Sequence, residues 1–155
     1  MFAKSIGKSA KPFLHESEQL LGAVMAQNAG ANAAVMVSAL RGPLATVKAY
    51  DRADRRHADA AEAAGEAGVK VDRRMIVAVT SHRLLIFRMG GAFTPKVKEL
   101  IGEAPIGDVE GIDVEPAGLS KAVTLRVRGT AIGIETARGQ PAENLPRALE
   151  LARAS

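Results

Sequence analysis

The sequence feature that most constrains the fold is the apolar run from Met75 to Met89, MIVAVTSHRLLIFRM, which the letters TSHR interrupt near its centre. Side chains of a strand alternate between the two faces of a sheet. Every second side chain from Met75 to Val79 therefore lies on one face, Ile76 and Ala78 lie on the other, and both sets are apolar. The run predicts an antiparallel hairpin whose first strand is covered on both sides. A buried helix is the alternative, which the polar break disfavours.

A second hairpin is predicted nearer the C-terminus. Apolar and polar residues alternate over residues 123–127 and again over residues 132–136, as in strands with one buried and one exposed face. Gly129 lies between the two runs, and glycine suits the tight connection of a hairpin. The two hairpins together indicate an antiparallel sheet.

Residues 144–153 predict an amphipathic helix. Leu145, Leu149 and Ala152 recur at helical spacing, and Pro146 lies in the first turn, where a backbone N–H has no helical partner to lose. We expect this apolar stripe to cover the open mouth of a barrel-like sheet.

Residues 16–27, 96–100 and 106–115 are expected to form three further strands, and residues 102–105 a turn. In the last of these strands the alternation slips by one residue. A bulge at Gly111 would restore the register, because an extra residue in one strand shifts the side chains that follow it.

We expect a single domain over residues 16–155, preceded by a flexible basic arm over residues 1–15. Residues 31–69 are interpreted as an insertion between the first and second strands, and residues 51–67 within it are rich in alanine and charge and offer little apolar surface. This insertion is either helical or partly disordered.

No membrane-spanning segment is expected. Residues 19–40 carry no charge, but Gln27 and Asn32 place polar groups at the centre of the stretch. The basic start of the chain is followed by His15 and Glu16 where a signal peptide would be apolar. With no cysteine in the chain, a cytoplasmic location is the expectation.

The hairpin sequence VAVTSHRLLIF resembles the "vavT-x-x-RLlvf" hairpin of bacterial pleckstrin-homology-like (PH-like) and GRAM domains, with Thr80 and Arg83 at the matching positions. Residues 105–109, PIGDV, are similar to a later strand entry of those domains. The resemblance implies an α+β fold in which a strongly bent antiparallel barrel or sheet of about seven strands is capped by a C-terminal helix. It also implies a non-catalytic module that binds lipid headgroups, peptides or proteins. For Thr80 and Arg83 we expect structural roles, in the turn and over the sheet.

The charge of the chain is unevenly distributed along the sequence. The formal net charge is +4, yet residues 99–118 contain six acids and no base. Basic residues gather just before them, and the candidates for binding an anionic surface are Lys70, Arg73, Arg74, Arg88, Lys96 and Lys98. The alternative is that neighbouring strands pair the two signs across a solvated face.

The sequence predicts no enzyme, cofactor or metal site. It lacks cysteine, its three histidines are far apart, and the acids of residues 108–115 do not have the spacing of a calcium loop. Ser81 and His82 are adjacent in a turn, which does not make a nucleophile and its base, and no phosphate-binding glycine loop occurs. Aromatic residues make up 3% of the chain, which disfavours specific nucleic-acid binding through stacked bases.

The function predicted on these grounds is that of a binding module whose ligand is a protein partner or the anionic inner surface of the membrane. One alternative is an interaction domain that binds no lipid and assembles into homo-oligomers through exposed sheet edges. An unrecognised small enzyme is the other.

Overall fold

The alternating apolar segments form seven strands of one open antiparallel sheet in the computed structural model, which describes residues 2–28, 74–90 and 96–154. The strands are β1 (Leu20–Asn28), β2 (Arg74–Thr80), β3 (Arg83–Gly90), β4 (Lys96–Pro105), β5 (Val109–Ala117), β6 (Ser120–Val127) and β7 (Thr130–Ala137). Their order across the sheet is β4-β3-β2-β1-β7-β6-β5. The described helices are α1 (Phe2–Ala10), α4 (Asn144–Arg153) and the 3-10 turns η1 (Lys11–Phe13) and η2 (Ile106–Asp108).

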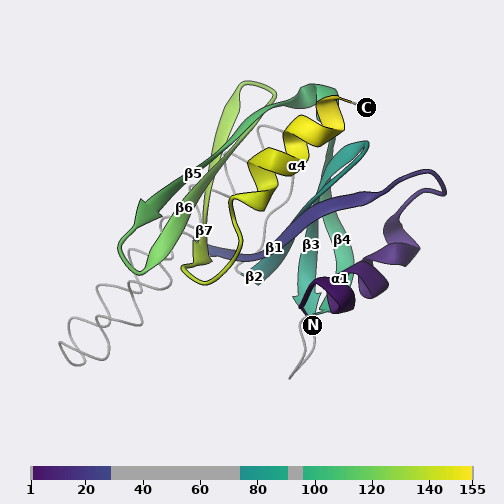
Figure 1. Ribbon diagram of the computed structural model, residues 1–155, viewed down its shortest axis with the longest axis horizontal. Helices are drawn as coiled ribbons and strands as arrows, with labels where there is room; N and C mark the ends of the chain where they lie inside the picture. The colour runs from purple at the N-terminus through teal and green to yellow at the C-terminus, as the bar shows by residue number, and fades with distance from the viewer. Residues whose placement is uncertain (1, 29–73, 91–95, 155) are drawn as a thin grey trace.

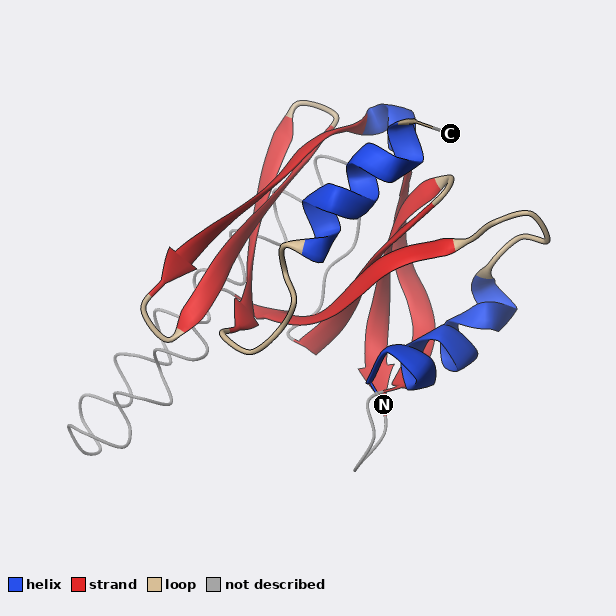
Figure 2. Ribbon diagram, viewed as in Figure 1, coloured by secondary structure: helices blue, strands red, loops and turns tan. Residues whose placement is uncertain are grey.

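Strand β1 belongs to both halves of the sheet. It pairs with β2 from Leu20 to Gln27 but with β7 only at Gln27 and Asn28. The β5–β7 half therefore diverges from the β1–β4 half, and α4 lies over the space between them (Figure 1). Figure 2 shows this arrangement of one helix over two diverging groups of strands.

The two faces of β2 contribute to two separate apolar clusters. Met75, Val77 and Val79 lie in the main core, between the halves of the sheet and α4. Ile76 and Ala78 lie in a second cluster on the opposite face, beneath α1. The prediction that this strand is covered on both sides is confirmed.

The expected flexible arm over residues 1–15 is corrected by the structure, which has the helix α1 there. Ile6 and Ala10, one helical turn apart, are fully buried against the outer face of the β1–β4 half. The side chain of Ser9 accepts a hydrogen bond from the Val97 N–H at 3.0 Å, which ties α1 to strand β4 at the edge of the sheet. The helix forms because the outer face of β2 and β3 is apolar and has to be covered.

Of the remaining sequence predictions, some are confirmed and one is wrong. Helix α4 and the second hairpin are confirmed, and the register of β5 against β6 shifts between Val109 and Gly111, where the bulge was expected. The predicted turn over residues 102–105 is wrong, because these residues continue β4 and pair with β3 past two register shifts. The predicted insertion over residues 31–69 lies outside the described residues.

Gly22 allows α4 to lie close to β1. A Cβ atom at this position would stand 3.1 Å from both the Ala148 Cβ and the Asn144 carbonyl oxygen.

We expect Gly22→Ala to lower the free energy of unfolding by about 1–3 kcal/mol, because α4 and β1 must move apart to make room for the added methyl group. Urea denaturation measures this loss. Gly133 in β7 has no atom within 4 Å of such a Cβ, so Gly133→Ala is the matched control and should leave stability unchanged or slightly raised; equal losses in both variants would contradict the close approach.

Candidate functional site

Thr80 and Arg83 of the hairpin form a network of hydrogen bonds and ion pairs with buried Glu18 and half-exposed Glu103, which we name the Glu18 clasp (Glu18, Thr80, Arg83 and Glu103). The Arg83 guanidinium donates to the Glu18 carboxylate through Nη2 at 2.6 Å and Nε at 2.9 Å. It also contacts Glu103 and donates to the Phe13 carbonyl at 3.0 Å. Arg83 thus joins the β2–β3 hairpin to the segment that follows α1.

Thr80 shapes the turn and orients the carboxylate. Its hydroxyl oxygen accepts hydrogen bonds from the backbone N–H of Arg83 at 2.9 Å and of His82 at 3.1 Å. The same hydroxyl donates to Glu18 at 2.5 Å. A threonine is suited to this position, since one short side chain both closes the turn and reaches the buried acid.

The side chain of Glu18 has no exposed surface, while that of Arg83 is 13% exposed. Burial raises the pKa of Glu18, but hydrogen bonds from Arg83, Thr80 and the His15 N–H outweigh it and lower that pKa from 4.5 to about 2. Hydrogen bonding to Glu18 in turn raises the pKa of Arg83. The carboxylate is fully engaged, so the clasp stabilises the fold and offers no free group for chemistry.

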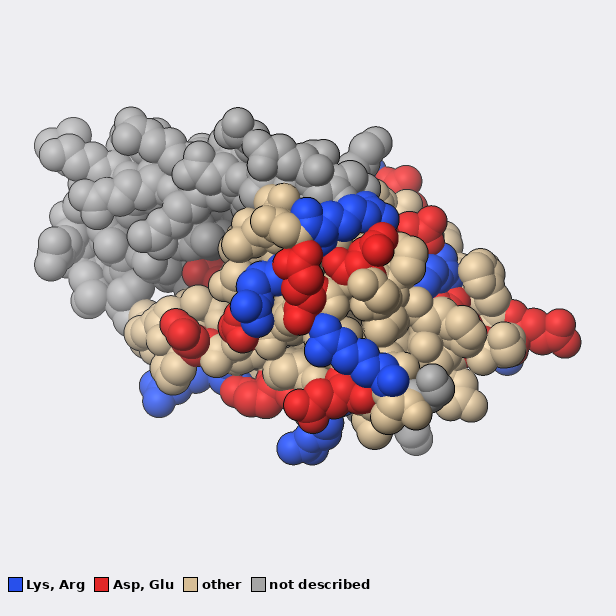
Figure 3. Space-filling model, turned by 90° about the horizontal axis from the view of Figure 1, so that it is seen from above, with Lys and Arg blue, Asp and Glu red and all other residues tan. Residues whose placement is uncertain are grey.

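Antiparallel pairing interleaves the charges that the sequence segregates. Two pairs link neighbouring strands, Arg88–Glu99 between β3 and β4 and Arg126–Asp113 between β6 and β5. A third pair, Arg128–Asp108, links the β6–β7 turn to η2. Figure 3 shows Lys and Arg side chains alternating with Asp and Glu on the face that it presents. The alternative in which neighbouring strands pair the two signs is the one observed for the first two pairs.

The predicted basic candidates are only partly brought together. Lys70 and Arg73 lie outside the described residues. Arg88 is paired with Glu99, whereas Arg74, Lys96 and Lys98 are exposed and form no ion pair with another described residue. Met75 pairs with Arg88, and Gly90 pairs with Lys96, so the three exposed bases lie at the same end of the sheet. Arg74 lies on the face of the second cluster, whereas Lys96 and Lys98 lie on the opposite face, because Val97 between them packs in that cluster.

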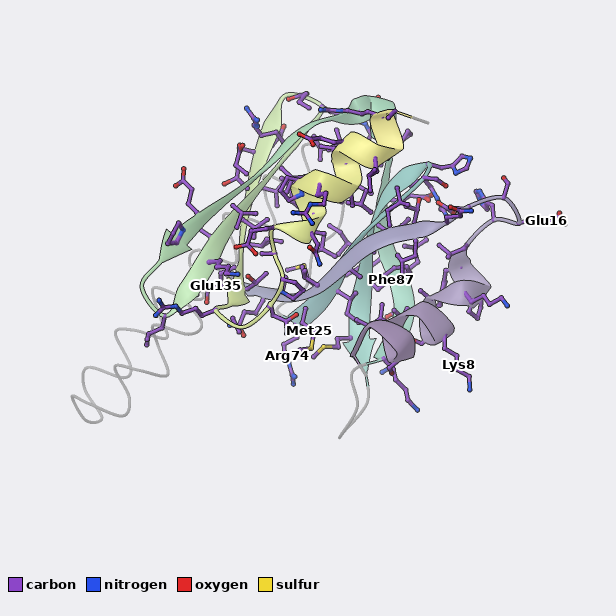
Figure 4. The ribbon with its side chains drawn as sticks, viewed as in Figure 1. Lys8, Glu16, Met25, Arg74, Phe87 and Glu135 are labelled. Atoms are coloured by element: carbon purple, nitrogen blue, oxygen red, sulfur yellow. The ribbon has the colours of Figure 1, made fainter. Side chains whose placement is uncertain are left out.

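Arg74 also lines a surface pocket of about 150 Å³, which we name the methionine pocket. Its described lining residues are Met25, Ala26, Gln27, Arg74, Met89, Ala137 and Gln140. They come from β1, β2, β3, the end of β7 and the β7–α4 connection, where the two halves of the sheet diverge. Figure 4 shows Met25 and Arg74 beside each other below the crossing of β1 and β2.

One wall of the methionine pocket is fixed by hydrogen bonds through Gln140. Its side-chain oxygen accepts from the Met25 N–H at 3.1 Å, a group that β7 leaves unpaired. Its backbone N–H donates to the Ala137 carbonyl at 2.9 Å, and its own carbonyl accepts from Lys121 at 2.9 Å. The opposite wall consists of methionine side chains, which are flexible and polarizable and adapt to the group they contact.

Ser81 and His82 are the adjacent pair considered for catalysis, and groups of His, Asp and Glu side chains were considered for metal binding. The Ser81 hydroxyl lies 2.7 Å from His82 Nδ1, but it also accepts from the Gln19 N–H, is exposed, and joins the start of β1 to the hairpin. In the described part of the chain, no group of three or more His, Asp or Glu side chains could hold a metal ion. Nor does any helix within residues 2–28, 74–90 and 96–154 have the length and apolar character needed to cross a membrane.

The architecture of seven antiparallel strands in one bent, open sheet with a C-terminal helix is the PH-like fold expected from the sequence. No family model and no curated protein matches the chain. Solved structures to which this chain is similar include two from Shewanella. A DUF1696 family protein with a pleckstrin-homology domain from Shewanella loihica PV-4 has a TM-score of 0.43 and 12% identity, covering 94% of this chain and 90% of that one. A pleckstrin homology domain from Shewanella amazonensis SB2B has a TM-score of 0.47 and 14% identity, covering 96% of both chains.

Sequence reasoning missed Glu18, Met25 and Met89 as site residues. The signal for Glu18 is indirect: an arginine in a short turn between two apolar strands needs a carboxylate, but many acids of the chain could supply it. Met25 and Met89 are 64 positions apart in the sequence and belong to different strands. Only the register of the sheet brings them to one pocket.

The clasp makes stability depend on pH. Because the pKa of Glu18 is depressed to about 2, its contribution is present above the unfolded value of 4.5 and is lost as the pH falls from there toward 2. The difference corresponds to about 3 kcal/mol. We expect Glu18→Gln to lower the free energy of unfolding at pH 7 by a similar amount. We also expect this variant to lose less stability than the wild type between pH 4.5 and 2, as measured by urea denaturation.

Glu16 provides the matched control, since it is exposed two residues away (Figure 4). The Glu16→Gln variant should retain the acid dependence of the wild type. If Glu18→Gln loses as much stability at acidic pH as the wild type does, other carboxylates cause that loss.

Proposed function

We propose that this protein is a non-catalytic binding module that recognises a protein partner through the methionine pocket. The observation that carries this proposal is the pocket itself: a concave, partly apolar site with one arginine among its described lining residues, built where several segments of the fold meet. Recognition sites of this kind combine an apolar floor with a few placed polar groups. The clasp, by contrast, is internally satisfied.

Binding to an anionic membrane is the less favoured candidate. Attraction to a lipid surface sums over basic residues that face it together, at roughly 1 kcal/mol each. On the described surface, several basic side chains are instead paired with acids of neighbouring segments. Arg74 forms no ion pair with another described residue and lines the pocket, which supports recognition of an acidic feature of a partner protein.

Selection of random linear peptides displayed on phage tests the proposal, with Ala137→Trp as the variant that fills the pocket. Ala137 is exposed at the end of β7 and lines the pocket, so the indole should block it without disturbing the core. Ala131→Trp places the same side chain on an exposed position of the same strand, outside the pocket. We expect enriched peptides to bind the wild type and Ala131→Trp, and to bind Ala137→Trp at least about tenfold more weakly, a loss of about 1.4 kcal/mol.

Absence of any enriched peptide, or equal binding to both variants, would contradict this function. Co-flotation with vesicles of phosphatidylglycerol or phosphatidylcholine separates the membrane alternative. We expect no recovery with either vesicle at physiological salt. Flotation with the anionic vesicles that is lost at high salt and in Arg74→Glu/Lys96→Glu would favour the membrane instead.

A further inference from the structure

We infer that the methionine pocket binds a short acidic peptide segment, with one apolar side chain held between Met25 and Met89 and a neighbouring carboxylate on Arg74. This inference rests on the proposed function and specifies its ligand class. It follows from the size of the pocket, the chemistry of its walls and the charges around its rim.

The size of the pocket selects a single side chain. A volume of about 150 Å³ is comparable to an apolar cavity that holds one benzene molecule. A leucine, methionine or phenylalanine side chain is of this order, whereas a lipid acyl chain needs a longer channel. Two thioethers and two alanine methyl groups supply apolar contact, and flexible methionine side chains accommodate apolar groups of different shape.

The polar groups of the lining determine what flanks that side chain. Arg74 is the charged residue among the described lining residues, and its guanidinium is suited to a carboxylate because it donates in a fixed planar geometry. Lys96 and Lys98 lie at the same end of the sheet but alternate with Val97, which packs in the same cluster as Met25 and Met89, so both lysines lie on the opposite face. A carboxylate next to the apolar anchor therefore meets positive charge at Arg74.

The acids nearest this end of the sheet do not oppose that charge. Glu99 is paired with Arg88. Glu135, which lies opposite Gln27 in the β1–β7 pairing, is buried and is within 3.4 Å of the Ser120 hydroxyl. The described rim of the pocket is therefore positive on balance, and a basic peptide is disfavoured.

The fixed wall contributes to affinity by preorganisation. Gln140 is held by four hydrogen bonds, with Met25, Ala137, Lys121 and Ala142, so the β7–α4 connection is ordered before a ligand arrives. Binding then needs to order only the methionine side chains and the peptide.

Methionine-methyl NMR tests the inference in the full chain. The chain has five methionines, and Met25→Leu and Met89→Leu assign the two pocket signals while keeping side-chain volume. Met75 is fully buried in the main core and serves as an internal reference for the fold. The probe is acetyl-Leu-Glu-Glu amide, and the controls are acetyl-Leu-Lys-Lys amide and acetyl-Ala-Glu-Glu amide.

We expect the acidic leucine peptide to shift the Met25 and Met89 methyl signals saturably and to leave Met75 unmoved. The lysine and alanine peptides should bind at least about tenfold more weakly, and Arg74→Glu should weaken the acidic peptide by a similar factor. Arg147→Glu, at an exposed position of α4, is the charge-matched control and should bind like the wild type.

Equal shifts with the lysine peptide, or no shift at Met25 and Met89, would overturn the assigned ligand class. If phage selection nevertheless yields peptides that the Ala137→Trp variant fails to bind, the binding function stands and only the acidic, single-anchor class is wrong. If selection yields none, the function itself fails. An unchanged Met75 signal in Arg74→Glu shows that the variant is folded.

Discussion

Strand β1 has to pair on both of its edges although its two neighbours diverge, and the rest of the molecule follows from this constraint. It pairs with β2 over nearly its whole length and with β7 over two residues. The backbone groups and apolar side chains exposed by the divergence must be covered, since buried polar groups without partners are costly. Helix α4 covers part of the opening, and Gly22 lets it approach closely. Beyond the helix, the Gln140 side chain takes the place of a strand at the Met25 N–H.

The methionine pocket is the part of this opening that neither α4 nor β7 fills. Its walls come from both halves of the sheet, so their relative position depends on the bend in β1. A site at such a junction gains its shape from elements that are fixed by the core rather than from a single loop. This explains why the apolar side chains of Met25 and Met89 are partly exposed beside an arginine, although both also pack against the second apolar cluster.

The sequence predicted strand β2 at the centre of the fold because a strand buried on both faces has apolar residues at both odd and even positions, as residues 75–79 do. It predicted α4 for the same reason, through the stripe of Leu145, Leu149 and Ala152. It failed for α1, because Ile6 and Ala10 are too few to distinguish a helix from a loose arm until the apolar face beneath them is known. Arg74 was predicted from charge alone, whereas its pocket partners depend on strand register, which a single sequence does not specify.

Strand β2 separates the stabilising interactions from the proposed binding surface. Arg74 begins the strand at the methionine pocket, and Thr80 ends it at the Glu18 clasp. The five residues between them, Met75 to Val79, are fully buried, so the strand is a rigid link with no polar side chain through which a charge at one end could act on the other. The clasp therefore sets how firmly the hairpin and the segment after α1 are joined, and the chemistry of the pocket is set independently by Arg74 and the two methionines. A ligand bound at one end of β2 has to be recognised there, by the groups of the pocket alone.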